Sequence, residues 1–105
     1  MSLSPEDRGM IEKIIDAEIE KVPNYIQFAR DPNVKSGMML TSDYDFVMGQ
    51  TFSSIISTFS SYYINKIQKT MTLPDQEQLQ GQIQEAVNVI IKRISEIRNA
   101  IFNCG

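Results

Sequence analysis

The residues of this chain that could do chemistry are carboxylates, lysines and serines, because the sequence has no histidine and a single cysteine, Cys104. Glu12, Asp16 and Glu20 recur every four residues, so neighbours in this row share one face of a helix. Such a face could hold a hard cation through oxygen ligands. Two lysines lie beside the row, however, and a solvated face of mixed charge explains all of these residues. We therefore expect no metal site here.

The other familiar kinds of catalytic or cofactor site are also missing from the sequence. Asp43 and Asp45 lie two residues apart, so they point to different sides of a helix start and fit caps better than an acid–base pair. Zinc sites and histidine triads are excluded by composition. The five glycines are isolated, so no phosphate-binding glycine loop occurs, and there is no GxSxG nucleophile turn. We expect a non-enzymatic protein without a cofactor.

The charge pattern argues against nucleic acid as a partner. The net charge is −3, and no basic stripe runs along any segment. Lys66 and Lys69 form one basic spot, and Lys92, Arg93 and Arg98 form another. Both spots lie toward the ends of predicted helices, where cations complement the helix dipole. A DNA-associated regulator that uses the second spot, on the last helix, is the third interpretation that we keep.

Targeting signals are equally sparse. No run of 18 apolar residues predicts a membrane span, and the acid-rich N-terminal region does not resemble a signal peptide. The polar helix faces mix both signs of charge, which disfavours a membrane surface. We expect a cytoplasmic location. Residues 1–3 are either native or a cloning remnant, and Cys104 is either an exposed free thiol or part of an intermolecular disulfide.

The elements that must position all these side chains are helices. Apolar residues at helical spacing predict a helix over 5–22, a short helical piece over 23–31, and long helices over 43–70 and 75–102. Three similar start signals, Ser4-x-x-Asp7, Ser42-x-x-Asp45 and Thr72-x-x-Asp75, resemble capping boxes. Pro23 is expected to end the first helix near residue 22. Residues 32–41 are predicted as a loop. We expect its Met38, Met39 and Leu40 to pack back onto the helices, with a methionine-lined groove as the alternative.

The last predicted helix carries a regular apolar seam. Its members are Ile83, Val87, Ile90, Ile94, Ile97 and Ile101, in steps of four and three residues. We expect this seam to face Phe52, Ile55, Ile56 and Phe59 of the helix over 43–70. The predicted fold is thus one all-α domain over residues 1–105: a helical bundle built on an antiparallel hairpin of two long helices, with the N-terminal helix and the short piece beside it.

Helix length leads to the functional expectation. A 28-residue helix is roughly 42 Å long, whereas a compact chain of this size has a radius of gyration of only about 13 Å. The N-terminal helix could not cover such a hairpin, so we expect a homodimer that buries the remaining apolar stripe, and possible association with another helical protein. The competing fold is a monomeric four-helix bundle whose long helices bend or break, for example at Gly49 or Gly81. The competing function is an apolar-ligand pocket around Phe59, Tyr62 and Tyr63.

Overall fold

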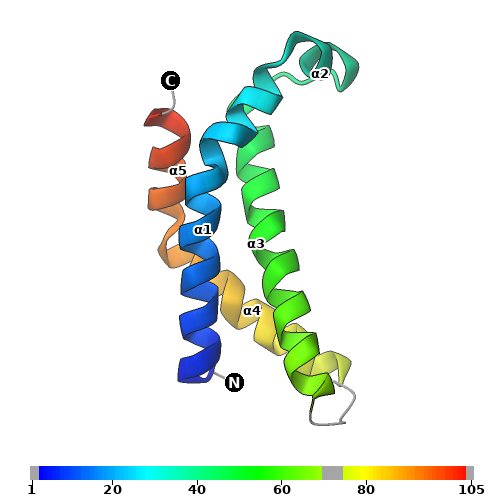
Figure 1. Cartoon of the computed structure of the whole chain (residues 1–105), viewed down its shortest axis with the longest axis vertical. Helices are drawn as coiled ribbons and strands as arrows, with labels where there is room; N and C mark the ends of the chain where they lie inside the picture. Colours follow the sequence, from blue (N-terminus) through cyan, green and yellow to red (C-terminus); the bar gives the residue numbers. More distant parts are fainter. Residues whose placement is uncertain (1–2, 70–74, 104–105) are drawn as a thin grey trace.

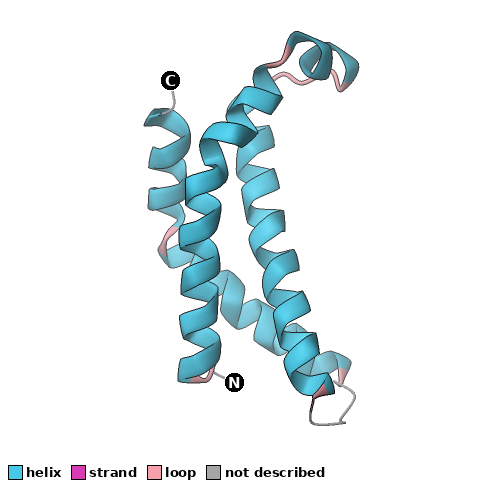
Figure 2. Cartoon of the chain, in the orientation of Figure 1, coloured by secondary structure: helices cyan, strands magenta, loops and turns pink. Residues whose placement is uncertain are grey.

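The protein is a small bundle in which every element is a helix (Figures 1 and 2). The computed structural model describes residues 3–69 and 75–103. Over these residues the elements are α1 (Pro5–Arg30), α2 (Pro32–Gly37), α3 (Asp43–Gln68), α4 (Gln76–Lys92) and α5 (Ile94–Asn103). The predicted all-α class is confirmed, and none of these helices carries an apolar stretch long enough to cross a bilayer.

Helix α1 begins where the sequence predicts and ends later. The Ser4 hydroxyl accepts a hydrogen bond from the backbone N–H of Asp7 at 3.1 Å, and Pro5 occupies the first turn. The expected end near residue 22 and the separate piece over 23–31 are wrong, since α1 continues through Pro23 to Arg30. Val22, Ile26 and Ala29 extend its buried stripe. Their burial outweighs the local cost of the proline, and Figure 1 shows the axis of α1 bending in its second half.

The predicted loop over 32–41 contains the short helix α2. Asp31 caps it, because its carboxylate accepts a hydrogen bond from the backbone N–H of Asn33 at 2.9 Å. Met38 and Met39 are 53% and 84% exposed, so our expectation that they pack back onto the helices is wrong for both. Only Leu40 of that group packs against the core. Met39 has a φ of 54°, which turns the chain toward α3.

Helix α3 matches the prediction over 43–70 as far as residue 68, and residues 70–74 lie outside the described part of the chain. Its buried face repeats every four residues: Val47, Thr51, Ile55, Phe59 and Tyr63. The main partner of α3 is α1, which lies beside it along most of its length (Figure 1). The prediction had instead paired α3 with the C-terminal helix. That pairing is the smaller contact, because the C-terminal region does not remain one helix.

The predicted helix over 75–102 breaks at Arg93, which separates α4 from α5. Arg93 has φ −108° and ψ 13°, and the expected break points Gly49 and Gly81 both lie inside intact helices. Figure 1 shows the result: α4 crosses obliquely toward the lower end of α3, whereas α5 runs beside α1. The turn lets Ile97 and Ile101 reach the core, where both are buried.

Helix α1 organises the core, because it contacts each of the other four helices. The buried cluster draws on all helices except α2 and consists of Ile11, Ile14, Ile15, Val22, Ile26, Ala29, Val47, Ile55, Phe59, Tyr63, Ala86, Val89, Ile90, Ile97 and Ile101. The molecule is elongated, with extents of 47 × 26 × 19 Å and a radius of gyration of 15.6 Å. A compact chain of this length would have a radius of gyration of about 13 Å.

Candidate functional site

The predicted seam divides between the core and the surface. Ile90, Ile97 and Ile101 are buried, and Ile94 is partly buried against them. Ile83 and Val87 are only half-buried, and among the described residues they do not belong to the side chains that pack on the core. The break at Arg93 changes the phase of the helix. The buried face of α4 is therefore Gln82, Ala86, Val89 and Ile90.

The predicted partners of the seam on α3 divide in the same way. Ile55 and Phe59 are fully buried, whereas Phe52 and Ile56 are half-buried at the edge of the core. The sequence therefore identifies the correct helix faces to within about one residue position, and the packing of α1 decides which members of each face become central. What remains outside is an apolar strip on α4, to which Ile91 also belongs with 55% of its surface exposed.

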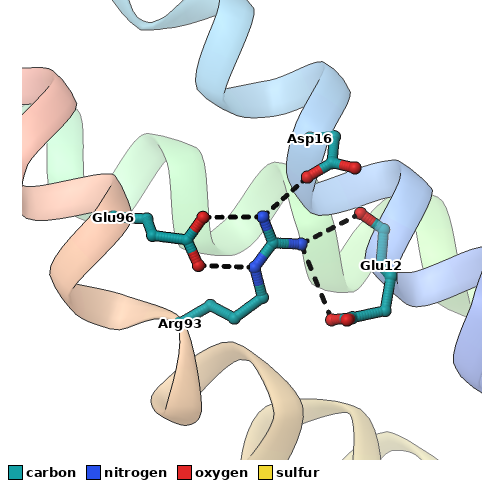
Figure 3. Close-up of polar contacts among 4 residues, drawn as sticks. All are labelled: Glu12, Asp16, Arg93 and Glu96. Carbon is teal, nitrogen blue, oxygen red and sulfur yellow. Dashed lines mark hydrogen bonds and ion pairs between the residues drawn. The ribbon is translucent and has the colours of Figure 1, made fainter.

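The polar side chains converge most closely on Arg93, at the junction of α4 and α5 (Figure 3). Its guanidinium donates to both carboxylate oxygens of Glu96, at 2.7 and 2.9 Å, and to Asp16 Oδ1 at 2.6 Å. It also donates to the backbone carbonyl of Glu12 at 3.3 Å and lies 3.6 Å from that residue's carboxylate. The hydrogen bonds with Glu96 raise the pKa of Arg93 above its ordinary value. This cluster fastens the C-terminal helices to α1.

The sequence did not predict this cluster. Glu12 and Asp16 were considered there as a possible cation site, and Arg93 only as a partner of a helix dipole. The cation that these acids hold is a guanidinium from a segment 77 residues away in the chain. Only the contact between α1 and the α4–α5 junction brings the charges together, so local spacing carried no signal. The described residues contain no cluster of histidine, cysteine, aspartate or glutamate suited to a metal ion.

Two buried carboxylates of α1 hold α1 and α3 together. Asp7 accepts hydrogen bonds from Lys66 Nζ at 2.7 Å and from the Tyr62 hydroxyl at 2.9 Å. Glu18, three turns further along, accepts hydrogen bonds from the hydroxyls of Tyr25 at 2.7 Å and Ser54 at 2.8 Å. Each carboxylate is nearly inaccessible to water, and each has the partners that a buried charge requires. Asp7 thus does more than the helix-start role that the sequence predicts for it.

The pKa values of the Asp7 cluster are shifted away from neutral pH. Burial opposes ionisation of Asp7, but hydrogen bonds from Lys66 and Tyr62 lower its pKa on balance. Burial and the hydrogen bond to Asp7 raise the pKa of Tyr62 to about 12, and the same carboxylate raises the pKa of Lys66. A general acid or base works best with a pKa near the operating pH. The cluster therefore has the electrostatics of a structural ion pair.

The aromatic residues predicted as a possible ligand pocket pack on one another. Phe59 is fully buried, and its ring centre lies 6.2 Å from that of Tyr63 and 5.9 Å from that of Tyr62. The Tyr62 hydroxyl is bound to Asp7, and the Tyr63 hydroxyl accepts a hydrogen bond from Gln78 at 3.4 Å. A cavity of about 290 Å³ touches Tyr62, and the rest of its lining is polar: Glu6, Asn65, Lys66 and Lys69. Apolar ligands usually bind in pockets with mainly apolar walls.

Two further hollows lie where α1 approaches the start of α3 and the end of α5. One has a volume of about 310 Å³ and includes Arg30, Asp43, Tyr44 and Phe102 in its lining. Tyr44 and Phe102 stack there with ring centres 4.8 Å apart, and Arg30 binds the Asp43 carboxylate at 3.2 Å. The other, of about 510 Å³, is an open groove along α1 between Pro23 and Asp31. The charged groups of these hollows are already engaged, because Arg30 and Lys35 form ion pairs with Asp43, and Asp31 caps α2.

Comparison with other proteins adds no assignment: no family model matches the chain, and no curated protein or solved structure shows significant similarity to it.

Proposed function

We propose that this chain is a non-enzymatic helical module that works by associating with a second copy of itself. The observation that carries the proposal is the amount of surface left exposed. The accessible surface is 6691 Å², whereas an average monomer of 12.0 kDa exposes about 6,000 Å². The surplus of about 700 Å² is close to the roughly 800 Å² that each partner buries in a standard protein–protein interface.

The kind of exposed side chain supports the same proposal. Ile91, Phe102 and Phe28 leave 55%, 62% and 49% of their surfaces open. Burial of apolar surface contributes about 25 cal/mol per Å², so covering any one of these side chains would favour association. The elongated shape leaves long helix faces available, and a two-fold pair would cover one such face twice.

A non-enzymatic role fits the electrostatics. The groups with resolved pKa shifts in the two ion-pair clusters move away from neutral pH, and their hydrogen bonds are made within the protein. An apolar-ligand pocket around Phe59, Tyr62 and Tyr63 has weaker support, because these rings fill the space between them. A DNA-associated role is also weaker, because Lys66 and Arg93 are already paired with carboxylates. The cytoplasm stays our predicted compartment, which cell fractionation would test.

The test is molar mass in solution, measured by light scattering over a hundredfold range of concentration. The proposal predicts about 24 kDa, twice the 12.0 kDa of the chain, with a fall toward 12.0 kDa only on dilution. The measurement is made under reducing conditions, so that a disulfide through Cys104 cannot produce the dimer. A mass of 12.0 kDa throughout the range would refute self-association.

A further inference from the structure

The outer face of α4 carries an apolar strip that the fold buries only in part. Ile83, Val87 and Ile91 recur every four residues along this helix. At 3.6 residues per turn, such residues stack along one side with a slow drift. Ile91 is 55% exposed, and Ile83 and Val87 are half-buried. Within the described residues, none of the three belongs to the side chains that form or pack on the buried core.

The strip is bordered by amides rather than charges. Three exposed amide residues follow the same four-residue spacing and lie beside the strip on the helix surface: Gln80, Gln84 and Asn88. Gln84 Nε2 donates to Asn88 Oδ1 at 3.4 Å, which orients these two side chains along the helix. Glu85 and Lys92 project roughly 140–160° away from Val87 at about 100° per residue, and Glu77 lies in the first turn of α4 on the amide side, before the strip begins. The result is a narrow face of three branched apolar residues and three amides.

An uncharged face of this composition fits a second copy of itself. In a two-fold pair the same patch meets itself, so a charge near the two-fold axis would face its own sign. Amide side chains avoid this problem because each one both donates and accepts hydrogen bonds. A strongly charged partner such as nucleic acid would find no opposite charge on the face. The surplus accessible surface of about 700 Å², which is a value for the whole chain, is close to what one protomer of a standard dimer buries.

We propose that a second copy of the chain docks on this face, with the Ile83–Val87–Ile91 strip of each protomer against that of its partner. This proposal rests on the self-association proposed above and names the surface that performs it. Val87 lies in the middle of the strip and is therefore nearest the two-fold axis. The amides of Gln84 and Asn88 border the buried strip and hydrogen-bond across it.

The test compares two substitutions of similarly exposed apolar residues on different faces. Ile91→Glu places a charge on the strip. Phe102→Glu places the same charge on α5, where Phe102 is 62% exposed and stacks on Tyr44. We expect Ile91→Glu to raise the dimer dissociation constant on the order of a hundredfold or more, since an unpaired charge would be buried. Phe102→Glu should leave it within about threefold. Circular dichroism checks that both variants fold.

The outcomes separate this inference from the proposed function. A monomeric wild-type chain overturns both. A dimeric wild type that stays dimeric as Ile91→Glu leaves self-association intact and overturns the α4 face. If only the Phe102→Glu dimer dissociates, the interface lies elsewhere. If the dimers of both variants dissociate, the interface extends beyond the strip. Either result also overturns the inference.

A crosslink gives a second measurement that does not depend on how Ile91→Glu folds. Val87→Cys, made in a Cys104→Ser background, should form a disulfide-linked dimer under mild oxidation, because the two Val87 positions meet near the axis. Thr58→Cys is the control, because Thr58 is an exposed residue of α3. Equal crosslinking of the two variants, or none from Val87→Cys, would contradict the proposed arrangement.

Discussion

Arg93 is the residue whose removal tests most directly how the C-terminal helices are held. Arg93→Met keeps the aliphatic length of the side chain and removes the guanidinium. The variant loses the bonds to Glu96, Asp16 and the carbonyl of Glu12. It also leaves three carboxylates close together without their cation. We expect α5 to detach from α1 more readily and the whole bundle to become less stable.

The magnitude follows from exposure. The Asp16 side chain is 65% exposed, so its ion pair contributes no more than about 0.5–1 kcal/mol despite the 2.6 Å distance. The Arg93 side chain is only 18% exposed, and its bond to the Glu12 carbonyl adds about 1 kcal/mol. Repulsion between Glu12 and Asp16, four apart on α1, adds a few tenths more. The expected loss is about 2 kcal/mol. At about 2.1 cal/mol/K per residue this lowers the melting temperature by about 9 °C.

The assay is thermal and urea unfolding followed by circular dichroism, with Lys92→Met as the matched control. Lys92 is the neighbouring residue, is exposed, and carries the same charge. Removing it should change the free energy of unfolding by less than about 0.5 kcal/mol. If Arg93→Met and Lys92→Met unfold at the same temperature as the wild type, the guanidinium does not fasten α4 and α5 to α1, and our reading of the break is refuted.

Three further predictions concern the core, the ion pair and the proline. Ile90→Asp should lower the free energy of unfolding by at least about 4 kcal/mol, since Ile90 is fully buried and a carboxylate there has no partner; unchanged helicity and unfolding midpoint would contradict this. Asp7 has a lowered pKa in the folded protein, so its contribution to the free energy of unfolding should be complete above pH 4 and decline as the pH falls through the folded pKa. Lys66 has a raised pKa, so its contribution should be lost as the pH rises above 10.5. Urea titrations of Asp7→Asn should therefore show a free energy of unfolding that depends less on pH at both ends of the range. Pro23→Ala should stabilise the protein by about 1–2 kcal/mol, because the restored helical N–H in α1 outweighs the greater freedom that the unfolded chain gains. A lower melting temperature would show instead that α1 needs its bend.

The helix starts could be predicted from the sequence because they depend on local chemistry. Ser4 and Ser42 each accept a hydrogen bond from the N–H three residues later, as their sequence patterns indicate. At α4 the N-cap is Asp75 itself, whereas the pattern Thr72-x-x-Asp75 had placed it three residues after the cap, and Thr72 lies outside the described residues. The helix ends followed a different rule. Pro23 has a local preference to end α1, but the burial of Val22, Ile26 and Ala29 prevails over it.

The candidate surface was predictable only in part. The steps of four and three residues from Ile83 to Ile101 describe one continuous helix, and a single seam follows only if that helix is unbroken. Arg93 is neither glycine nor proline, so nothing local announces the break. Once α5 turns, the core takes Ile90, Ile97 and Ile101 and leaves Ile83 and Val87 on the flank. The Arg93 contacts were equally hidden, because they join residues 77 and 81 positions apart.

The break at Arg93 also means that the direction of α5 is specified from outside its own segment. Nothing in residues 76–103 requires the turn, so the same stretch as an isolated peptide should favour one straight helix. In the intact chain, the Glu12 carbonyl and the Asp16 carboxylate bind the guanidinium, and Ile97 and Ile101 are buried in the core, so contacts with other helices favour the bent form. A substitution at Asp16 should therefore weaken the attachment of a helix that it precedes by some eighty residues. Double-mutant cycles between α1 and Arg93 would measure this coupling directly.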